Sequence, residues 1–341
     1  MKNFSLLLLM ALVMTITSCH YLDDIFDEVE PTKPLVQTYA TGLSAPIGLV
    51  MGDQNRLWVS ENGPGAFDGQ VSMIMPGGMV YPAIVGFPTY INPEGLPGGV
   101  NHLAYKNGML YILSEVDGRL YMADVSKFRP GSTPVQASEL AYHEIRSFIL
   151  DYDFGPLDTN ESNLYNLTFG PGGDLFIVDA AANAIIRRDA GDASLSVFAF
   201  IPDIPNPTPV GPPTIDVVPN GIVWDGERFL ISTLIGFPFP AGESRIYELD
   251  HDGNISVYQE GFTSLVDIAL GHDQLPMVLQ FSEFSLANGG FQPMQGKVII
   301  ANGTTQTILK DKLNMPTSLE LDGRKAYVTS LADGTVTRII W

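Results

Sequence analysis

Residues 165–179, YNLTFGPGGDLFIVD, decide the fold of this chain. They contain an apolar strand, a glycine-rich turn and a second apolar strand, which is the pattern of a β-hairpin. The pattern returns at starts that lie about 47 to 64 residues apart, a spacing typical of the blades of a propeller. The other copies are residues 47–61, 101–115, 220–233, 267–280 and 317–330.

Further strands complete each repeat. A third apolar strand follows every copy, beginning at Gln70, Arg119, Ala184, Arg245, Lys297 and Thr335. A fourth follows most copies, beginning at Val80, Ser194, Ile255 and Thr305. Four strands in each of six repeats predict an all-β fold, namely a six-bladed β-propeller with four-stranded blades.

The two ends of the chain are expected to meet in the last blade. Trp341 follows the third strand of the sixth repeat, so that blade lacks one strand. Residues 35–43, LVQTYATGL, have the residue pattern of a fourth strand and precede the first repeat. We expect them to close the last blade, because this pairing removes an exposed sheet edge. A two-sheet sandwich would explain neither the recurrence nor the short final repeat.

The N-terminus has the pattern of an export signal. Lys2, the apolar run 4–16 and the small residues before Cys19 predict a signal peptide over residues 1–18. Residues 16–19, ITSC, resemble a bacterial lipobox. This resemblance implies that Cys19 is lipidated and anchors the chain to the outer membrane on its periplasmic or cell-surface side. An ordinary signal with an incidental cysteine is the alternative. Because the sequence has one cysteine, lipidation leaves no thiol for other chemistry.

Acidic residues dominate both the segment after Cys19 and the whole chain. Residues 19–34 lack strand alternation and are predicted to be a solvated tether that precedes the propeller domain, residues 35–341. They resemble the export tags of surface lipoproteins in Bacteroidetes-like bacteria, although a simple hydrophilic spacer explains them equally well. The formal net charge of −20 disfavours nucleic acid as a partner.

One end of the propeller is predicted to carry the site. In each repeat the start of the first strand and the end of the second lie at the same end of the blade, over the central channel. The residues at the starts are Asn101, His102, Asn166, Asn220, Asp267 and Thr317. Those at the ends are Glu61, Glu115, Asp179, Thr233, Gln280 and Ser330.

Long loops are expected to surround this opening, and long loops in compact repeat folds are often functional. They span residues 87–99, 152–163, 202–219, 235–243 and 282–295. Their aromatic residues are Tyr90, Phe154, Phe237, Phe239, Phe284 and Phe291. The sequence therefore predicts a pocket with aromatic walls and a carboxylate floor. Its expected ligand-binding residues are Asn101, Asn166, Asp179, Glu115, Phe237 and Phe239.

Carboxylates at the opening suggest a cation. Glu61, Glu115, Asp179 and Asp267 offer the oxygen ligands that Ca²⁺ or Mg²⁺ prefers. They could instead cap turns, as Asp179 would do in the segment VDAAAN. His102 is a candidate general base, although lone histidines are more often structural. The sequence shows no nucleophile elbow, metalloprotease helix or phosphate loop.

Residues 41–340 resemble the ScyD/ScyE family of bacterial proteins. The resemblance is carried by residues 234–250 (LIGFPFPAGESRIYELD), 258–270, 43–52 and 162–183. It implies the propeller fold, whereas the family's own biochemical activity is not settled.

The blades are also similar, more distantly, to NHL-repeat proteins and to the gluconolactonase and strictosidine synthase superfamily. Lactonases of that group hold a divalent cation with Glu, Asn and Asp ligands. Asn220 and Asp267 match two of these positions, and Asn101 or Asn166 could match a third. The family's Glu falls at Ile47 here, so Glu61 would have to replace it.

Two functions follow from these patterns. The first is a binding or scaffold propeller that recognises a small molecule or a protein partner. The second is a metal-dependent lactonase or hydrolase in which Asp267, Asn220, Asn101 and Glu61 hold the cation, with His102 or Glu61 as the base.

Overall fold

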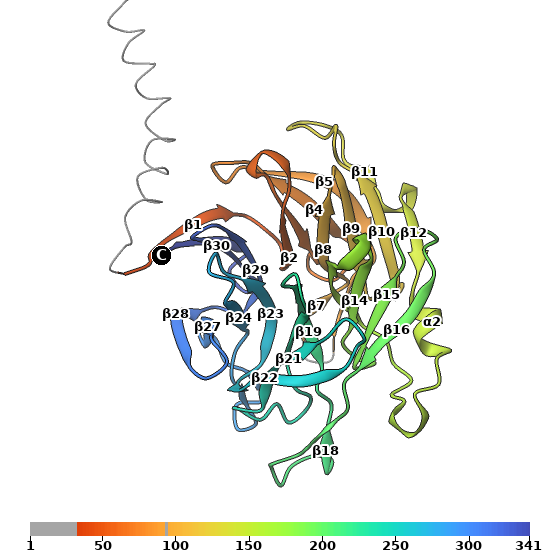
Figure 1. The fold of residues 1–341 in the computed structure, drawn as a ribbon. Coiled ribbons are helices and arrows are strands. Elements are labelled where there is room, and N and C mark those ends of the chain that lie inside the picture. The colour runs from red at the N-terminus through yellow and green to blue at the C-terminus, as the bar shows by residue number, and fades with distance from the viewer. Residues whose placement is uncertain (1–32, 93–94) are drawn as a thin grey trace, which may run out of the picture.

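The structure, a computed structural model, describes residues 33–92 and 95–341. Within these ranges the strands form six large sheets around a central axis, which confirms the predicted six-bladed β-propeller (Figure 1). The predicted signal peptide, Cys19 and nearly all of the tether lie outside the described residues. In the described part of the chain, no helix is both long enough and apolar enough to cross a membrane.

The first three blades follow one another along the chain. The first contains β2 (Pro46–Met51), β3 (Leu57–Glu61), β4 (Gly69–Ile74) and β5 (Val80–Phe87). The second contains β8 (Val100–Lys106), β9 (Met109–Ser114), β10 (Arg119–Asp124) and β12 (Ala141–Glu144). The third contains β13 (Leu164–Phe169), β14 (Leu175–Asp179), β15 (Ala184–Arg188) and β16 (Leu195–Phe200).

The last three blades complete the circle. The fourth contains β19 (Pro219–Trp224), β20 (Phe229–Thr233), β21 (Ser244–Leu249) and β22 (Ile255–Phe262). The fifth contains β23 (Leu265–Leu270), β24 (Pro276–Gln280), β27 (Gly296–Ala301) and β28 (Gln306–Leu313). The sixth contains β29 (Pro316–Asp322), β30 (Lys325–Ser330), β31 (Thr335–Ile340) and β1 (Leu35–Thr41).

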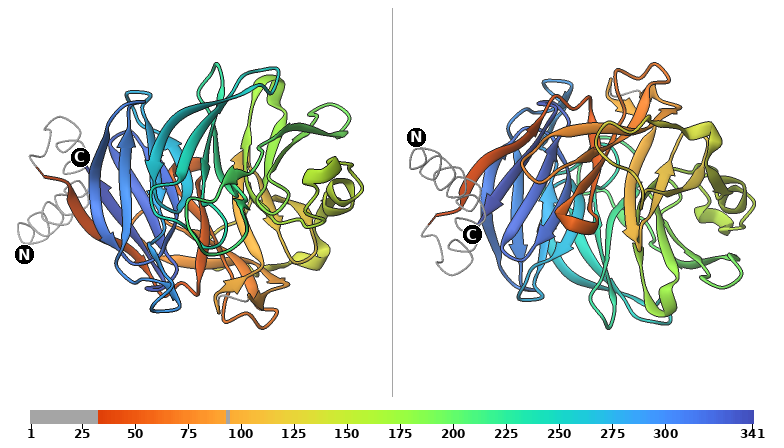
Figure 2. Two further views of the ribbon diagram at one scale, coloured as in Figure 1. Left: turned by 90° about the horizontal axis from the view of Figure 1, so that it is seen from below. Right: turned by 90° about the horizontal axis from the view of Figure 1, so that it is seen from above.

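The sixth blade is closed by the N-terminal strand, as predicted. β1 runs antiparallel to β31, pairing Leu35 with Ile340 at one end and Thr41 with Thr335 at the other. Figures 1 and 2 show β1 in red beside the blue strands of the C-terminal blade. Ala40 is buried with residues of the first and sixth blades, so β1 also contributes to the junction between the chain's first and last repeats.

The second blade departs from the expected plain repeat. Its fourth strand, β12, is short and follows an insertion, which explains why the sequence pattern did not reveal it. Part of the insertion, β11 (Val135–Gln136), crosses to the first blade and runs parallel to β5. The outer edge of the first blade is therefore covered by a fifth strand, and this covering protects the edge from unwanted pairing.

Short elements decorate the blades. Pairs of two-residue strands form small antiparallel sheets outside the blades. These pairs are β6 (Tyr90–Ile91) with β7 (Pro97–Gly98), β17 (Ile204–Pro205) with β18 (Thr214–Ile215), and β25 (Phe284–Ser285) with β26 (Gly290–Phe291). The helical segments are α2 (Arg146–Leu150), η1 (Asp53–Asn55), η2 (Ala137–Glu139), η3 (Gly155–Leu157) and η4 (Pro171–Gly173).

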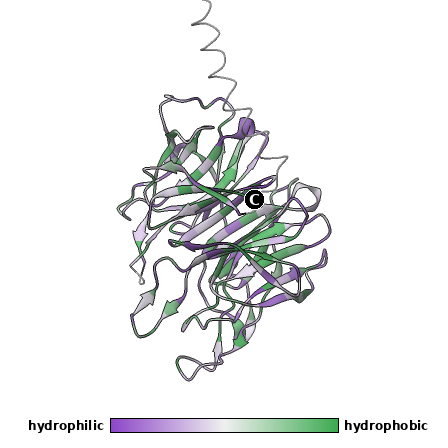
Figure 3. Cartoon of the chain, turned by 90° about the vertical axis from the view of Figure 1, so that its left-hand side faces the viewer, coloured by the Kyte–Doolittle hydropathy of each residue, from purple (hydrophilic) through white to green (hydrophobic). Residues whose placement is uncertain are grey.

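The hydrophobic core lies between the blades. Among the described residues, six clusters of buried side chains each join two neighbouring blades, and the last of them joins the sixth blade to the first. Strands buried on both faces explain this arrangement, and β3, β14 and β20 are buried along their whole lengths. Figure 3 shows hydrophobic residues along many of these strands.

Each innermost strand is irregular near its start. The regular pairing with the second strand is interrupted after Pro46, Val100, Leu164, Pro219, Leu265 and Pro316. A bulge re-aims the side chain that it carries. All six irregularities lie at the same end of the described blades, so they direct a set of side chains toward one mouth of the channel.

Two glycines allow the inner strands to approach closely at this level. A Cβ atom on Gly48 would lie 2.6 Å from the Cα of His102 in the next blade. A Cβ atom on Gly221 would lie 2.8 Å from the backbone nitrogen of Ile268. Glycine is required at both positions because backbone atoms of the neighbouring blade occupy the space.

Candidate functional site

A cavity of about 450 Å³, here called the upper cavity, lies at the mouth of the channel where the inner strands are irregular. Its inner ring consists of one residue from each innermost strand: Ile47, Asn101, Tyr165, Asn220, Val266 and Thr317. Its outer ring consists of the residue that directly follows the second strand of each blade: Asn62, Glu115, Ala180, Leu234, Phe281 and Leu331. The repeat thus supplies twelve lining positions, two from each described blade.

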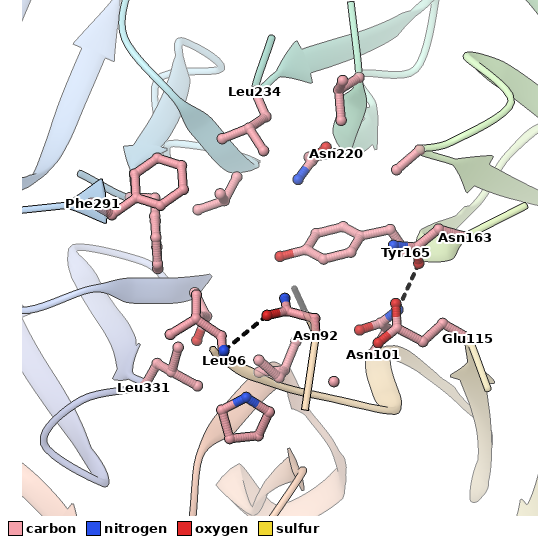
Figure 4. Close-up of a pocket in the computed structure, with 18 of the residues that line it drawn as sticks. Asn92, Leu96, Asn101, Glu115, Asn163, Tyr165, Asn220, Leu234, Phe291 and Leu331 are labelled. Atoms are coloured by element: carbon pink, nitrogen blue, oxygen red, sulfur yellow. Dashed lines mark hydrogen bonds between the residues drawn. The ribbon is translucent and has the colours of Figure 1, made fainter. Parts of the chain in front are cut away.

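The upper cavity has a polar side and an apolar side (Figure 4). Blades 2 and 3 contribute Asn101, Glu115, Asn163 and Tyr165 to the polar side. Blades 4 to 6 contribute mostly apolar side chains, Leu234, Val266, Phe281, Phe291 and Leu331, beside the polar Asn220 and Thr317. Figure 4 shows the labelled members of the two groups facing each other across the cavity. Such a division can orient a ligand that has one polar and one apolar end.

An aromatic cluster extends the apolar side. The ring of Phe239 lies 4.8 Å from that of Phe284 and 5.1 Å from that of Phe291. Phe237 is 48% exposed and packs on the same group, with its ring 6.2 Å from that of Phe239. The structure therefore places both Phe237 and Phe239 on the cavity, as the loop sequences predicted.

Tyr165 forms the floor between two parts of the channel. Burial raises the pKa of its hydroxyl above the ordinary value, and a hydrogen bond with Asn220 opposes that rise. The other face of the residue contacts His102, whose ring centroid lies 5.1 Å away. The sequence pattern did not single out Tyr165, although it occupies the position equivalent to Asn101 and Asn220.

Glu115 contributes a carboxyl group to the polar side. Burial raises the pKa of its carboxyl, opposed first by a hydrogen bond from Asn101. Asn101 also donates to the Oδ1 of Asn163 at 3.2 Å and to the carbonyl oxygen of Leu164 at 2.8 Å. Asn101 and Glu115 are therefore fixed together on the floor of the upper cavity.

A second hollow of about 260 Å³, here called the lower cavity, lies deeper in the channel. It contains three residues that the sequence placed at the opening, His102, Asn166 and Asp267, together with Glu320. The predicted ring is thus split between two levels, because the structure brings Asn101 and Asn220 to the upper cavity and these three residues to the lower one.

Asp267 is occupied by hydrogen bonds. Its Oδ1 accepts from the Nδ2 of Asn166 at 3.0 Å and from its neighbour's nitrogen, Ile268 N, at 2.9 Å. Its Oδ2 accepts from the Oγ of Ser318 at 3.0 Å and from Leu319 N at 2.8 Å. The carboxylate therefore connects blades 3, 5 and 6 across the channel.

His102 is buried beneath Tyr165. Burial lowers the pKa of its imidazole, whereas the nearby Asp267 carboxylate, 3.9 Å from Nδ1, acts in the opposite direction. Within the described part of the chain, its Nε2 has no hydrogen-bond partner. The ring faces the lower cavity and not the upper one, so a base at this position would act away from the aromatic wall.

Glu61 and Asp179 lie outside both cavities and stabilise their own blades. Glu61 accepts from Ser44 N at 2.7 Å and from the side chains of Gln70 and Ser72. Asp179 accepts from the Oγ of Ser162 at 2.6 Å and from Asn163 N at 2.8 Å, and it also caps the turn at Ala182. The turn-capping alternative that the sequence left open describes Asp179.

The predicted cation ligands do not fit a metal ion. Asp267, Asn220, Asn101 and Glu61 lie at different levels, and the carboxylates of Asp267 and Glu61 already accept several hydrogen bonds. Ile47 presents an apolar side chain to the upper cavity where the lactonase resemblance calls for Glu. Among the described residues, His, Cys, Asp and Glu form no group of three or more that could hold a metal ion.

Glu320, in the lower cavity, should make the free energy of unfolding depend on pH. Burial raises the pKa of its carboxyl from 4.5 to about 8, and the negative charge of Asp267 adds to the rise. Because the folded state then binds this proton more tightly than the unfolded state, the contribution of Glu320 to stability is greatest at low pH and declines as the pH rises from 4.5 to 8. One proton contributes a slope of at most about 1.4 kcal/mol per pH unit.

Replacing Glu320 with Gln should remove this decline. The expected result is that the difference in unfolding midpoint between pH 5.5 and pH 7.5 becomes smaller in Glu320→Gln than in the unmodified chain. Urea unfolding at both pH values measures it. An equal pH dependence in the two proteins would show that Glu320 titrates normally.

Comparisons with known proteins give the fold. No family model matches the chain, so its membership of the ScyD/ScyE family is not confirmed. No curated protein matches its sequence. Solved structures do match along nearly the whole chain. The PQQ-bound aldose sugar dehydrogenase of Streptomyces coelicolor is 14% identical with a TM-score of 0.58, and the match covers 92% of this chain and 99% of the other.

Two further structures are similar in the same way. A putative gluconolactonase is 15% identical with a TM-score of 0.54, over 91% of this chain and 93% of the other. A luciferin-regenerating enzyme is 12% identical with a TM-score of 0.57, over 90% and 95%. The likeness is one of fold. These identities are too low to carry a reaction from those proteins to this chain.

Proposed function

We propose that this chain binds a small molecule whose apolar, aromatic part lies in the upper cavity. The division of that cavity into an aromatic and aliphatic side and a polar side supports the proposal. Its volume of about 450 Å³ lies within the usual range of ligand pockets, about 300 to 1,000 Å³. The sequence left open a protein partner, but a concave cavity of this volume at the channel mouth suits a small molecule better.

The geometry of the site supports the binding of a small molecule better than it supports metal-dependent hydrolysis. The residues that would hold the cation are separated, and His102 faces the lower cavity. A metal-dependent lactonase therefore remains only the alternative that the sequence suggests.

Three further proposals rest on the sequence patterns alone. They are membership of the ScyD/ScyE family, lipidation of Cys19 and attachment to the outer membrane.

Filling the upper cavity should weaken the binding of an aromatic probe. We expect EDTA-treated protein to bind one molecule of 2-naphthol with a dissociation constant on the order of 10–100 μM. Leu331→Trp and Leu234→Trp each place an indole in the cavity and should weaken binding at least about tenfold, since the probe loses its apolar contact. Isothermal titration calorimetry measures the affinity.

The matched control is Ile308→Trp, because Ile308 is 55% exposed on the outer strand β28 and lines neither cavity. This variant should bind 2-naphthol normally. Thermal unfolding of all three variants establishes that they are folded. No binding by the unmodified protein, or equal binding by the two cavity variants and the control, would refute the proposal. Binding that disappears on EDTA treatment would favour the cation alternative instead.

A further inference from the structure

A third hollow, here called the side groove, adjoins the polar side of the upper cavity. This side groove has a volume of about 780 Å³ and lies between blades 2 and 3. It shares Asn92, Glu115 and Asn163 with the upper cavity. Because the same three side chains line both hollows, the hollows are neighbours on either side of the Glu115 carboxyl. A ligand that extends past this carboxyl would contact both.

The junction depends on a close approach of the loop that contains Gly98. A Cβ atom at Gly98 would lie 2.3 Å from the Oε1 of Glu115 and 2.9 Å from the ring of Tyr90. Glycine therefore lets this loop pack against Glu115 and brings Asn92 to the cavity. Asn92 accepts a 2.8 Å hydrogen bond from Leu96 N through its oxygen, and Figure 4 shows its nitrogen on the side toward the cavity.

The side groove differs chemically from the upper cavity. Most residues of its lining carry groups that donate or accept hydrogen bonds, including Asn160, Glu161, Ser162 and Arg146. Tyr90 adds a ring that is 40% exposed. Hydroxyl groups match such a lining because each can donate and accept at once. An aromatic ring offers in addition a flat apolar surface for the C–H face of a sugar or other polyol.

The charges of the groove disfavour an anionic ligand. Two carboxylates, Glu115 and Glu161, line it against one guanidinium. That guanidinium, of Arg146, is held by the backbone, since it donates to the carbonyl oxygens of Val116 at 2.9 Å and of Glu115. A phosphate or carboxylate would therefore meet net negative charge in the groove.

We infer that the natural ligand is an aromatic molecule with a polyhydroxylated head group, as in an aryl glycoside. This inference rests on the proposed function, because the aromatic part occupies the upper cavity. The polyhydroxylated part lies in the side groove and contacts Glu115, Asn160 and Glu161. Ligands of this shape use the apolar and polar sides of the site at the same time.

Naphthyl glycosides test the inference against 2-naphthol. At least one of the 2-naphthyl β-glucoside, β-galactoside and α-mannoside should bind at least about tenfold more tightly than 2-naphthol, because several hydrogen bonds are added. Glu161→Ala should weaken that glycoside about fivefold, the effect of about one hydrogen bond. The same variant should leave 2-naphthol binding unchanged, since Glu161 lines only the side groove. Asn160→Gly is a second variant with the same expected pattern.

Glu260→Ala is the control, because the Glu260 side chain is 71% exposed on the fourth blade. It should change neither affinity. Two outcomes would overturn this inference and leave the proposed function standing. In the first, 2-naphthol binds but no glycoside binds more tightly. In the second, Glu161→Ala and Asn160→Gly affect both probes equally. If 2-(1-naphthyl)ethylamine binds more tightly than every glycoside, the groove recognises an ammonium group and the inference is also wrong. If 2-naphthol itself does not bind, the proposed function fails.

Discussion

Asp267→Ala is expected to lower the free energy of unfolding by about 3 to 5 kcal/mol, a size typical of removing one partner from a buried charged network. Four donors lose their acceptor at once, two from the backbone and two from Asn166 and Ser318. Each buried donor left unsatisfied costs about 1 to 3 kcal/mol, and water entering the adjacent lower cavity offsets part of this. The loss should appear as a lower urea midpoint.

Two further variants show whether the hydrogen bonds are responsible. Asp267→Asn keeps the volume but turns an amide N–H₂ toward donors, so it should also destabilise the protein, though less than alanine does. Asp311→Ala is the control, because Asp311 is 56% exposed and forms only a surface ion pair with Lys310. That pair should contribute less than about 1 kcal/mol. If Asp267→Ala changed stability no more than Asp311→Ala, the carboxylate would not connect the blades.

The fold was predictable because each blade repeats the same apolar pattern. Segments such as 165–179 and 317–330 share strand, turn and strand at similar length, and their recurrence predicts the blades without any knowledge of tertiary contacts. Closure by β1 followed from the strand missing in the last repeat. The crossing of β11 to the first blade was not predictable, because a two-residue strand inside an insertion has no periodicity of its own.

The site was predictable only in part because a shift of one residue moves a side chain to a different level. Aligning the six repeats by sequence gave Asn166 and Asp267 the same position as Asn220. The strand pairing instead makes Tyr165 and Val266 equivalent to Asn220. The irregular start of each inner strand produces this shift, and apolar and polar residues alternate too weakly there to reveal it.

A signal for the correct register was nevertheless present. The first strands share an apolar residue two positions after the inner-ring residue, which gives Leu49, Leu103, Leu167, Ile222, Ile268 and Leu319. Aligning the repeats on these residues places Tyr165 and Val266 in the ring. The pairing of Leu103 with Ile112, nine residues later, and of Leu49 with Val59, ten residues later, also explains why Glu115 lines the cavity and Glu61 does not.

Removal of β1 should produce the largest loss of stability. A chain that begins at Gly42 lacks the strand that pairs with β31 from Leu35 to Thr41 and the buried side chain of Ala40. We expect a loss on the order of 5 kcal/mol, comparable with the whole stability of many domains, about 5 to 15 kcal/mol. The exposed edge of β31 should also pair between molecules, since an open strand edge is a template for association.

A chain that begins at Lys33 is the matched control, because it keeps β1 intact. It should melt at the temperature of the longer chain and run as a single species in size-exclusion chromatography. The chain that begins at Gly42 should melt at a lower temperature and form larger species. A synthetic peptide of residues 33–42 should reverse both effects by restoring the fourth strand of the last blade. Equal melting temperatures for the two chains would mean that pairing of β1 with β31 does not hold the propeller closed.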